Sequence, residues 1–199
     1  MIHLNKHIVS IVLFTLISTA VSAANSQQSA SQNAAPKNPT VVMHTSKGPI
    51  TLELYADKAP VTVANFLDYA TSGFYNGTIF HRVIKRFMIQ GGGFTQDMQQ
   101  KNTKAPIVNE SGNGLYNERW TIAMARTNDP NSATSQFFIN TKMNTNLDAG
   151  RGQPGYAVFG IVTDGQYVVQ AIEKTPTATR GRHGDVPVEP IIIERVEVQ

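Results

Sequence analysis

The segment FHRVIKRFMIQGG, residues 80–92, carries the residue types in this chain that are best placed to do chemistry together. Alternate side chains of a strand share a face, so Met88 and Gln90 point to one side, while His81 and Arg82 face opposite sides. A face with Arg82, Met88 and Gln90 combines apolar surface, a fixed cation and an amide. The same pattern is also compatible with a solvated Arg82 and a Met88 that only fills the core.

A second segment, SQFFIN, places two phenylalanines side by side. In a strand Phe137 and Phe138 lie on opposite faces, so one can fill the core while the other lines an exposed groove. Adjacent aromatic residues in strands usually serve packing, and this pair alone does not decide between the two uses.

Several kinds of chemistry are poorly supported. The chain has no Cys, which excludes disulfides, thiolate nucleophiles and Cys-based metal sites. The histidines that lie beyond the first 23 residues are isolated, so we expect no metal and no cofactor. Gly91-Gly92-Gly93 lacks the Lys and Ser/Thr of a phosphate loop and indicates a turn or bulge. Since no Gly-x-Ser-x-Gly motif is present, a hydrolase or transferase is not favoured.

Length and charge describe a globular protein. The 199 residues suffice for one domain with an appendage, and the formal net charge of +3 is too small to indicate a nucleic-acid or membrane partner.

The N-terminal residues predict export. Lys6 precedes an uncharged apolar run over residues 8–20, and the small residues Val21, Ser22 and Ala23 follow. This pattern is typical of a cleavable signal peptide over residues 1–23, although a buried helix or an uncleaved anchor is the alternative. Residues 24–39, rich in Ala, Ser, Gln and Asn, indicate a flexible linker. The globular domain is then expected over residues 40–199, in the periplasm and with no stable membrane association.

The elements that must position Arg82 and its neighbours are mostly strands. Helices are expected at Ala59–Ala70, where apolar residues follow a helical period after Pro60, and at Gln166–Lys174. Gly91 is expected to end the fourth strand, and residues 94–104 to form a loop. Strands are expected at Val41–Thr45, Ile50–Tyr55, Thr78–Ile84, Phe87–Gln90, Thr121–Ala125, Gln136–Asn140, Ala157–Val162 and Ile191–Val198. This order favours a mainly β barrel or sandwich over alternating βαβ units.

Together, FHRVIKRFMIQGG, SQFFI and GYAVFG resemble the cyclophilin family of peptidyl-prolyl cis–trans isomerases over Val41 to Val198. The resemblance implies a closed eight-stranded antiparallel β-barrel capped by two α-helices. NGL at 113–115 and TIAMAR at 121–126 are similar to the bacterial periplasmic subtype. Its partners would be unfolded or flexible proline-containing polypeptides, bound by a monomer.

The resemblance also implies site residues. Arg82 corresponds to the catalytic arginine, with His81 packed near it. Phe87, Met88, Phe138 and Leu147 would hold the proline ring, and Tyr156 stands where many members have histidine. The remaining substrate-binding residues would be Gln90 and Gln136, which hydrogen-bond around the arginine, and Ala125, Arg126 and Thr127, which line the groove before the proline.

Prolyl isomerisation explains why the sequence shows no nucleophile motif, metal site or phosphate-binding loop. Rotation about the peptide bond breaks no covalent bond, so it needs neither nucleophile nor metal. The twisted transition state leaves a lone pair on the proline nitrogen, to which a guanidinium can donate. A peptide-binding or chaperone module that keeps the groove without depending on catalysis is the alternative function.

Two positions depart from the family pattern. Asn146 stands where many cyclophilins have a tryptophan that binds cyclosporin, so weak cyclosporin binding is expected. Trp120 stands where glycine is expected, and we interpret it as a packing residue.

Overall fold

The computed structural model describes residues 38–150 and 152–199. The predicted signal peptide and nearly all of the predicted linker lie outside the described residues. Within them, no helix is both long and apolar enough to cross a membrane. The strands are β1 (Thr40–Thr45), β2 (Gly48–Leu54), β3 (Thr78–Ile84), β4 (Met88–Thr95), β5 (Thr121–Met124), β6 (Phe137–Asn140), β7 (Val158–Asp164), β8 (Thr177–Arg180), β9 (His183–Pro187) and β10 (Ile192–Val198). The helices are α1 (Pro60–Thr71), α2 (Gln166–Glu173) and the 3-10 turn η1 (Thr145–Leu147).

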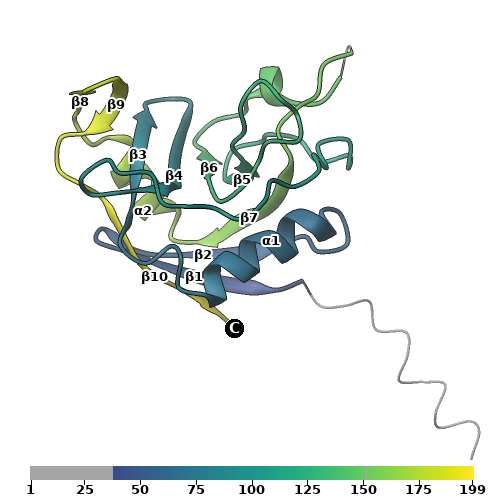
Figure 1. The fold of residues 1–199 in the computed structure, drawn as a ribbon, viewed down its shortest axis with the longest axis horizontal. Coiled ribbons are helices and arrows are strands. Elements are labelled where there is room, and N and C mark those ends of the chain that lie inside the picture. Colours follow the sequence, from purple (N-terminus) through teal and green to yellow (C-terminus); the bar gives the residue numbers. More distant parts are fainter. Residues whose placement is uncertain (1–37, 151) are drawn as a thin grey trace, which may run out of the picture. The chain divides into compact units, whose positions relative to one another are not determined.

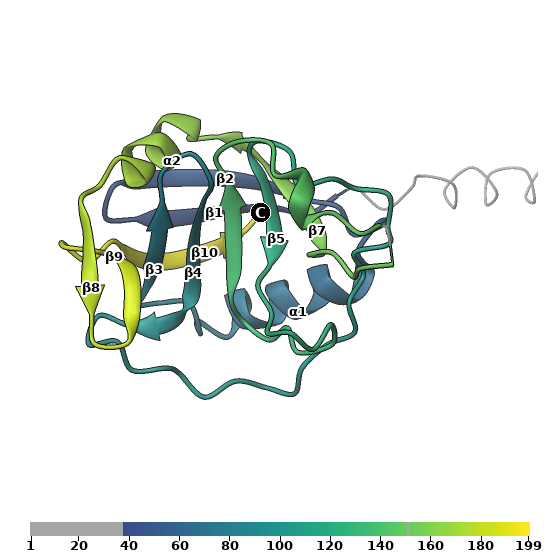
Figure 2. The same cartoon turned by 90° about the horizontal axis from the view of Figure 1, so that it is seen from above.

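Eight antiparallel strands close into a barrel in the order β1-β10-β3-β4-β6-β5-β7-β2 (Figures 1 and 2). The predicted barrel with two helices is therefore confirmed, and the sandwich is not what forms. Closure leaves none of the eight strands with an unpaired edge. The strands β3, β4, β6 and β5 are consecutive neighbours, which brings the two predicted motifs onto one continuous stretch of sheet.

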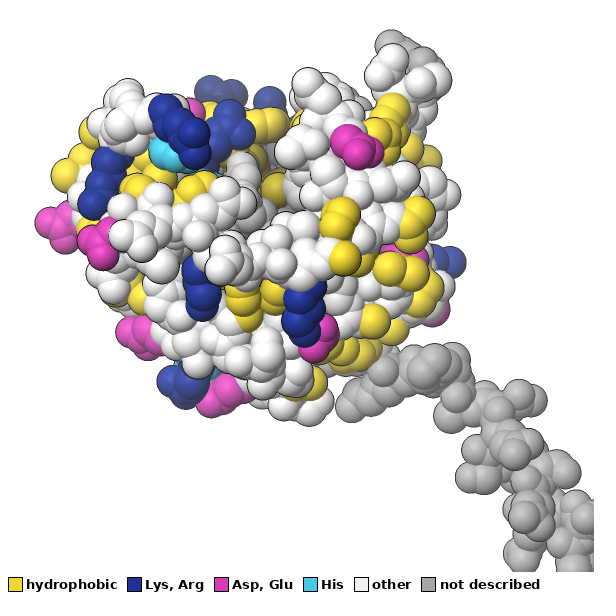
Figure 3. Space-filling view, viewed as in Figure 1, with side chains coloured by type: hydrophobic (Ala, Val, Ile, Leu, Met, Phe, Trp, Pro, Cys, Tyr) yellow, Lys and Arg dark blue, Asp and Glu magenta, His cyan; other side chains and the backbone are white. Residues whose placement is uncertain are grey.

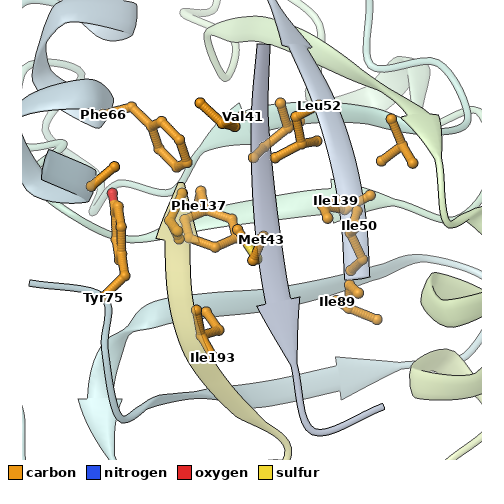
Figure 4. Close-up of a cluster of buried hydrophobic side chains, with 14 of the residues drawn as sticks. Val41, Met43, Ile50, Leu52, Phe66, Tyr75, Ile89, Phe137, Ile139 and Ile193 are labelled. Atoms are coloured by element: carbon orange, nitrogen blue, oxygen red, sulfur yellow. The ribbon is translucent and has the colours of Figure 1, made fainter. Parts of the chain in front are cut away.

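The barrel is filled by side chains that alternate along its strands. Val41 and Met43 of β1 and Leu52 of β2 are fully buried, as the period of two requires (Figure 4). Helix α1 starts at Pro60, whose fixed φ suits the first helical position. Phe66 on its buried face meets Phe137 edge-on at 5.7 Å between ring centroids. Figure 2 shows α1 and α2 on opposite sides of the barrel.

The glycine run does not end β4, so that expectation was wrong. The strand continues through Gly91-Gly92-Gly93 to Thr95, and Phe94, expected in a loop, is 7% exposed. The expected irregularity is nevertheless present, because the β3–β4 register shifts around Phe80. Gly92 has φ +81, and a Cβ there would lie 2.7 Å from the Phe137 ring. The glycines therefore let the strand pass close to core aromatic rings.

Three elements were not predicted, the strands β8 and β9 and the turn η1. The hairpin β8–β9 and the turn η1 carry no apolar alternation, and all of β8 is exposed. The hairpin lies beside β3, at the corner of the barrel next to Arg82 (Figure 1). Apart from the C-terminal end of β4, the predicted strands and helices are confirmed, with ends that agree to within two residues.

Candidate active site

Arg82 projects from the outer surface of the barrel. Its neighbours in β3, His81 and Val83, are buried, whereas the Arg82 side chain is 45% exposed. Across the β3–β4 ladder Arg82 is paired with Gln90. Its Nε lies 3.8 Å from the Oδ2 of Asp185, which belongs to β9. The guanidinium therefore lies at the surface near the Asp185 carboxylate, with Gln90 as its neighbour across the strand pair.

A pocket of about 190 Å³ opens beside Arg82, and because most of its lining side chains are apolar or aromatic we call it the apolar pocket. It is lined by Arg82, Phe87, Met88, Gln90, Ala125, Arg126, Phe138, Leu147 and Tyr156. Every one of these residues was predicted from the sequence. The volume is below the roughly 300–1,000 Å³ of drug-sized ligand sites, which suits a single small ring.

The two phenylalanines of β6 divide as the alternation requires. Phe137 is fully buried in the main core, whereas Phe138 belongs to a smaller apolar cluster with Met88 and Val158. Phe138 is paired with Gln90 on β4, and its ring meets Tyr156 edge-on at 5.6 Å. Phe137 therefore fills the core while Phe138 lines the pocket, which settles the choice that the sequence pattern left open.

Two glutamine side chains, Gln90 and Gln136, line the same cavity as Arg82. Gln90 Nε2 donates a hydrogen bond to Gln136 Oε1 at 3.0 Å. A Cβ at Gly93 would lie 2.5 Å from the Gln136 side chain, so this glycine makes room for the amide. The bond orients both side chains and joins Gln136, the residue before β6, to β4.

Arg126 closes the opposite wall of the pocket. Its guanidinium donates to the backbone oxygens of Gly155, Pro154 and Thr127 and lies 4.5 Å from the centre of the Tyr156 ring. It therefore ties the loop after β5 to the loop before β7. Thr127 was predicted in the groove, but it is not among the lining residues, and its hydroxyl bonds to Ser132 instead.

The buried Asn140 and Asn144 stabilise the walls of the pocket through hydrogen bonds, and neither residue was predicted from the sequence. Asn144 Nδ2 donates to the backbone oxygen of Phe87 at 2.8 Å and to Asn140 Oδ1 at 2.7 Å. The backbone oxygen of Asn144 accepts from Leu147 at 2.9 Å. Asn144 thus fixes two walls of the pocket, Phe87 and Leu147. The signal available was the Asn-rich stretch Asn140–Asn146, which has no apolar pattern.

His81 lies beneath the site and does not line the apolar pocket. Its ring is 5% exposed and packs on Phe94 at 4.6 Å between centroids. Burial, together with the nearby positive charge of Arg82 and the neighbouring His183, lowers the pKa of His81 to about 4. The imidazole is therefore neutral at neutral pH and adds no charge beside Arg82.

A second, more polar cavity adjoins the first. It has a volume of about 460 Å³ and shares Arg82 and Gln90 with the apolar pocket. His81 and Gln136, which were predicted in the site, line this cavity instead. The hairpin residues Arg182, His183, Gly184 and Asp185, which were not predicted, complete it. Among the described residues, no three His, Asp or Glu side chains are grouped so that they could hold a metal ion.

Residues 40–198 match the family model of the cyclophilin type peptidyl-prolyl cis-trans isomerases. The chain belongs to the cyclophilin family. As a cyclophilin of this type it is an isomerase, and the family resemblance stated from the motifs is confirmed.

Relatives of this cyclophilin carry the same activity in their names. Peptidyl-prolyl cis-trans isomerase cyp18 of Streptomyces antibioticus is 59% identical and covers 80% of this chain and 98% of its own. Peptidyl-prolyl cis-trans isomerase B of Escherichia coli is 55% identical, with coverages of 79% and 98%. Peptidyl-prolyl cis-trans isomerase A of Dickeya dadantii is 49% identical and covers 98% of both chains.

A solved structure matches the fold. The cyclophilin type isomerase of Cryptosporidium parvum, crystallised in the presence of the dipeptide Ala-Pro, has a TM-score of 0.70 and 29% identity. The match covers 80% of this cyclophilin and 98% of that chain. The barrel with its two helices is thus the fold of the family.

The structure shows where the two positions that depart from the family pattern, Asn146 and Trp120, lie in this cyclophilin. Asn146 is exposed in η1, next to the pocket residue Leu147. Trp120 has φ +78, the left-handed backbone conformation that favours glycine, which explains why glycine is expected there. Its side chain packs partly buried against the main core, as interpreted from the sequence.

Proposed function

We propose that this isomerase acts on X-Pro bonds of exported proteins during folding, with Arg82 as its catalytic residue. The observation that carries the proposal is the half-exposed Arg82 guanidinium at the rim of an apolar, ring-sized pocket. The proline ring would be anchored between Phe87, Met88 and Phe138 while the preceding carbonyl rotates. Leu147 would complete the site for the ring, and Ala125 and Arg126 would line the groove for the residue before the proline.

The arrangement suits amide rotation. The barrier of about 18–20 kcal/mol comes from amide resonance, which is lost when the bond twists. The proline nitrogen then becomes a hydrogen-bond acceptor, so donation from Arg82 is stronger in the transition state than in the planar ground state. An arginine stays protonated at every working pH and offers several donors in a rigid plane.

A protease-coupled assay with an Ala-Pro-Phe-type peptide tests the role of Arg82. Arg82→Ala should lower kcat/KM by about 10²–10³-fold, the size of effect when one preorganised transition-state donor is removed. Arg195→Ala is the matched control, because Arg195 is exposed on β10, outside both cavities. Equal rates for Arg82→Ala and the wild type would contradict the proposal. A wild type without measurable activity on this peptide would instead favour the alternative, a peptide-binding or chaperone module that keeps the groove without depending on catalysis.

The N-terminal segment supports export. Lys6, the apolar run over residues 8–20 and the small residues before Ala24 form a signal-peptide pattern, and a chain without Cys avoids mispaired disulfides in an oxidising compartment. The Dickeya dadantii relative matches over nearly the whole chain, whereas the Escherichia coli relative matches without about a fifth of it. We therefore propose a periplasmic mature protein that begins at Ala24.

N-terminal sequencing of the protein from a periplasmic fraction tests this localisation. A mature terminus at Ala24 supports it, and an intact Met1 in the cytoplasmic fraction contradicts it.

We also propose that the mature protein is a monomer. Sedimentation equilibrium should give the mass of one chain, and the mass of two chains would refute the proposal.

Cyclosporin binding should be weak, because Asn146 replaces the tryptophan that donates a hydrogen bond to it in many family members. We expect a dissociation constant above the micromolar level in a titration with the wild type. Asn146→Trp should bind more tightly. A submicromolar constant for the wild type would contradict this proposal and leave the isomerase activity untouched.

A further inference from the structure

The polar cavity extends the active-site groove toward the β8–β9 hairpin. Arg82 and Gln90 line both this cavity and the apolar pocket, so a peptide bound in the pocket has a direct route into it. Its volume of about 460 Å³ is more than twice that of the apolar pocket, at about 190 Å³. The cavity is therefore large enough for a side chain of a residue that flanks the proline.

The floor of this cavity is aromatic. The ring of Phe94 lies between the two imidazoles, with centroids 4.6 Å from His81 and 5.2 Å from His183. His81 is 95% buried, and its Nδ1 has no hydrogen-bond partner. A buried polar atom without a partner is costly unless a ligand or water satisfies it. The floor is thus aromatic and contains one buried nitrogen without a hydrogen-bond partner.

The charges around the cavity and the pocket are predominantly positive. Among the described lining residues there are three guanidinium groups, on Arg82, Arg126 and Arg182, and one carboxylate, on Asp185. The Arg82–Asp185 distance of 3.8 Å joins two half-exposed side chains, and such pairs neutralise one another weakly.

Positively charged side chains are also prominent on the surface around this cavity. Figure 3 shows dark blue side chains gathered around a histidine at the corner where Figure 1 places β8 and β9. Arg182 is exposed there, and its Nε donates only a long 3.5 Å bond to His183. Its guanidinium therefore remains accessible to a carboxylate, for which the planar fork is well matched.

We propose that the polar cavity is a specificity subsite that binds an acidic side chain of the substrate close to the proline, with Arg182 as its recognition residue. The inference deepens the proposed function and rests on it, because the subsite acts only on a peptide held in the groove. Asp185 limits the preference by placing one negative charge on the cavity wall.

Isomerisation rates of short peptides test the subsite. The peptides contain one Ala-Pro or Xaa-Pro bond and differ only in a Glu, Gln or Lys placed before or after the proline. NMR exchange gives kcat/KM for each without a protease that would add its own specificity. At one position at least, the wild type should prefer Glu over its isostere Gln by about two- to fivefold, as for an exposed ion pair. Lys there should be the poorest substrate, and added salt should reduce the preference.

Three variants locate the preference. Arg182→Gln should lower the Glu/Gln ratio toward one. Asp185→Asn should raise the ratio above that of the wild type, and asparagine tolerates the φ of +59 at this position. Arg195→Gln removes the same charge from β10, outside both cavities, and should leave the ratio unchanged.

Two results would overturn the subsite: a wild-type ratio of one or less at every position, or an Arg182→Gln ratio equal to that of the wild type. A wild type that is inactive on all the peptides would instead refute the proposed function. The two failures are therefore distinguishable.

Discussion

His81 connects the active site to the stability of the domain. Burial against Phe94 lowers its pKa to about 4, whereas an unfolded chain restores the ordinary value of 6.5. Between these two pH values the unfolded chain binds a proton that the folded domain excludes. The free energy of unfolding should therefore fall as the pH falls from 6.5 to 4, and this residue accounts for about 3 kcal/mol of the loss. Above pH 6.5 it contributes no pH dependence.

Urea unfolding at pH 7 and pH 5 measures this effect. The wild type should lose about 2 kcal/mol more than His81→Gln over this interval, because glutamine does not titrate. If His81→Gln lost stability as steeply as the wild type, the buried histidine would not be its cause.

Trp120 carries a local conflict between side chain and backbone. Its φ of +78 disfavours any residue with a Cβ. The backbone is held by bonds on both sides, since Trp120 N donates to Asn140 O at 2.8 Å and Val162 N donates to Trp120 O at 2.9 Å. Trp120→Gly and Trp120→Ala both lose the indole packing, but only glycine relieves the strain. The Gly variant should be more stable than the Ala variant by about 1 kcal/mol in urea unfolding. An Ala variant of equal or greater stability would contradict this explanation.

At the scale of elements, β4 depends on glycine where it crosses the aromatic core. Gly92→Ala would place a Cβ 2.7 Å from Phe137 and 2.9 Å from Tyr75, with φ at +81. Overpacking and left-handed strain together should destabilise the domain by about 2–4 kcal/mol. Gly112→Ala is the control, because a Cβ there meets nothing within 4 Å. The urea midpoint should fall for Gly92→Ala and stay nearly unchanged for Gly112→Ala. Equal midpoints for both variants would show that the close approach is tolerated.

The elements also show where sequence patterns succeed and fail. Strands with one buried face, such as β1 with Val41 and Met43, were predicted because the alternation itself is the signal of burial. The exposed hairpin β8–β9 has no such signal, since its place is set by packing against β3. The residues of the site also fall into a group that was predicted and a group that was not. The pocket walls were predicted from the motifs, whereas Arg182 and Asp185 come from the unpredicted hairpin, far from those motifs in the chain.

At the scale of the whole molecule, closure of the barrel assembles the site. Sheet neighbours β3, β4 and β6 place Arg82, Gln90 and Phe138 next to one another, although the chain separates β4 from β6 by a long connection. The two cavities share the Arg82–Gln90 pair, so a change in the hairpin acts on the same guanidinium as a change in the apolar pocket.

Contacts with the barrel indicate where the independently folding domain begins in the chain. Pro39 O accepts from Leu54 N at 2.8 Å, and Asn38 Nδ2 donates to Glu53 Oε1 at 2.9 Å, so structural contacts start two residues before the predicted domain boundary at Thr40. A chain that begins at Asn38 should match the chain that begins at Ala24 in urea midpoint and in kcat/KM.

A chain that begins at Met43 is the contrasting variant. It lacks the fully buried Val41 and half of the β1 pairing with β2 and β10. Loss of one large buried side chain alone costs about 2–5 kcal/mol, and the opened barrel adds unpaired strand edges on both sides. This chain should unfold at clearly lower urea concentration and lose activity in proportion to its unfolded fraction. If the Asn38 chain were as unstable as the Met43 chain, residues before Asn38 would contribute to the fold, and the domain boundary would have to be moved toward the N-terminus.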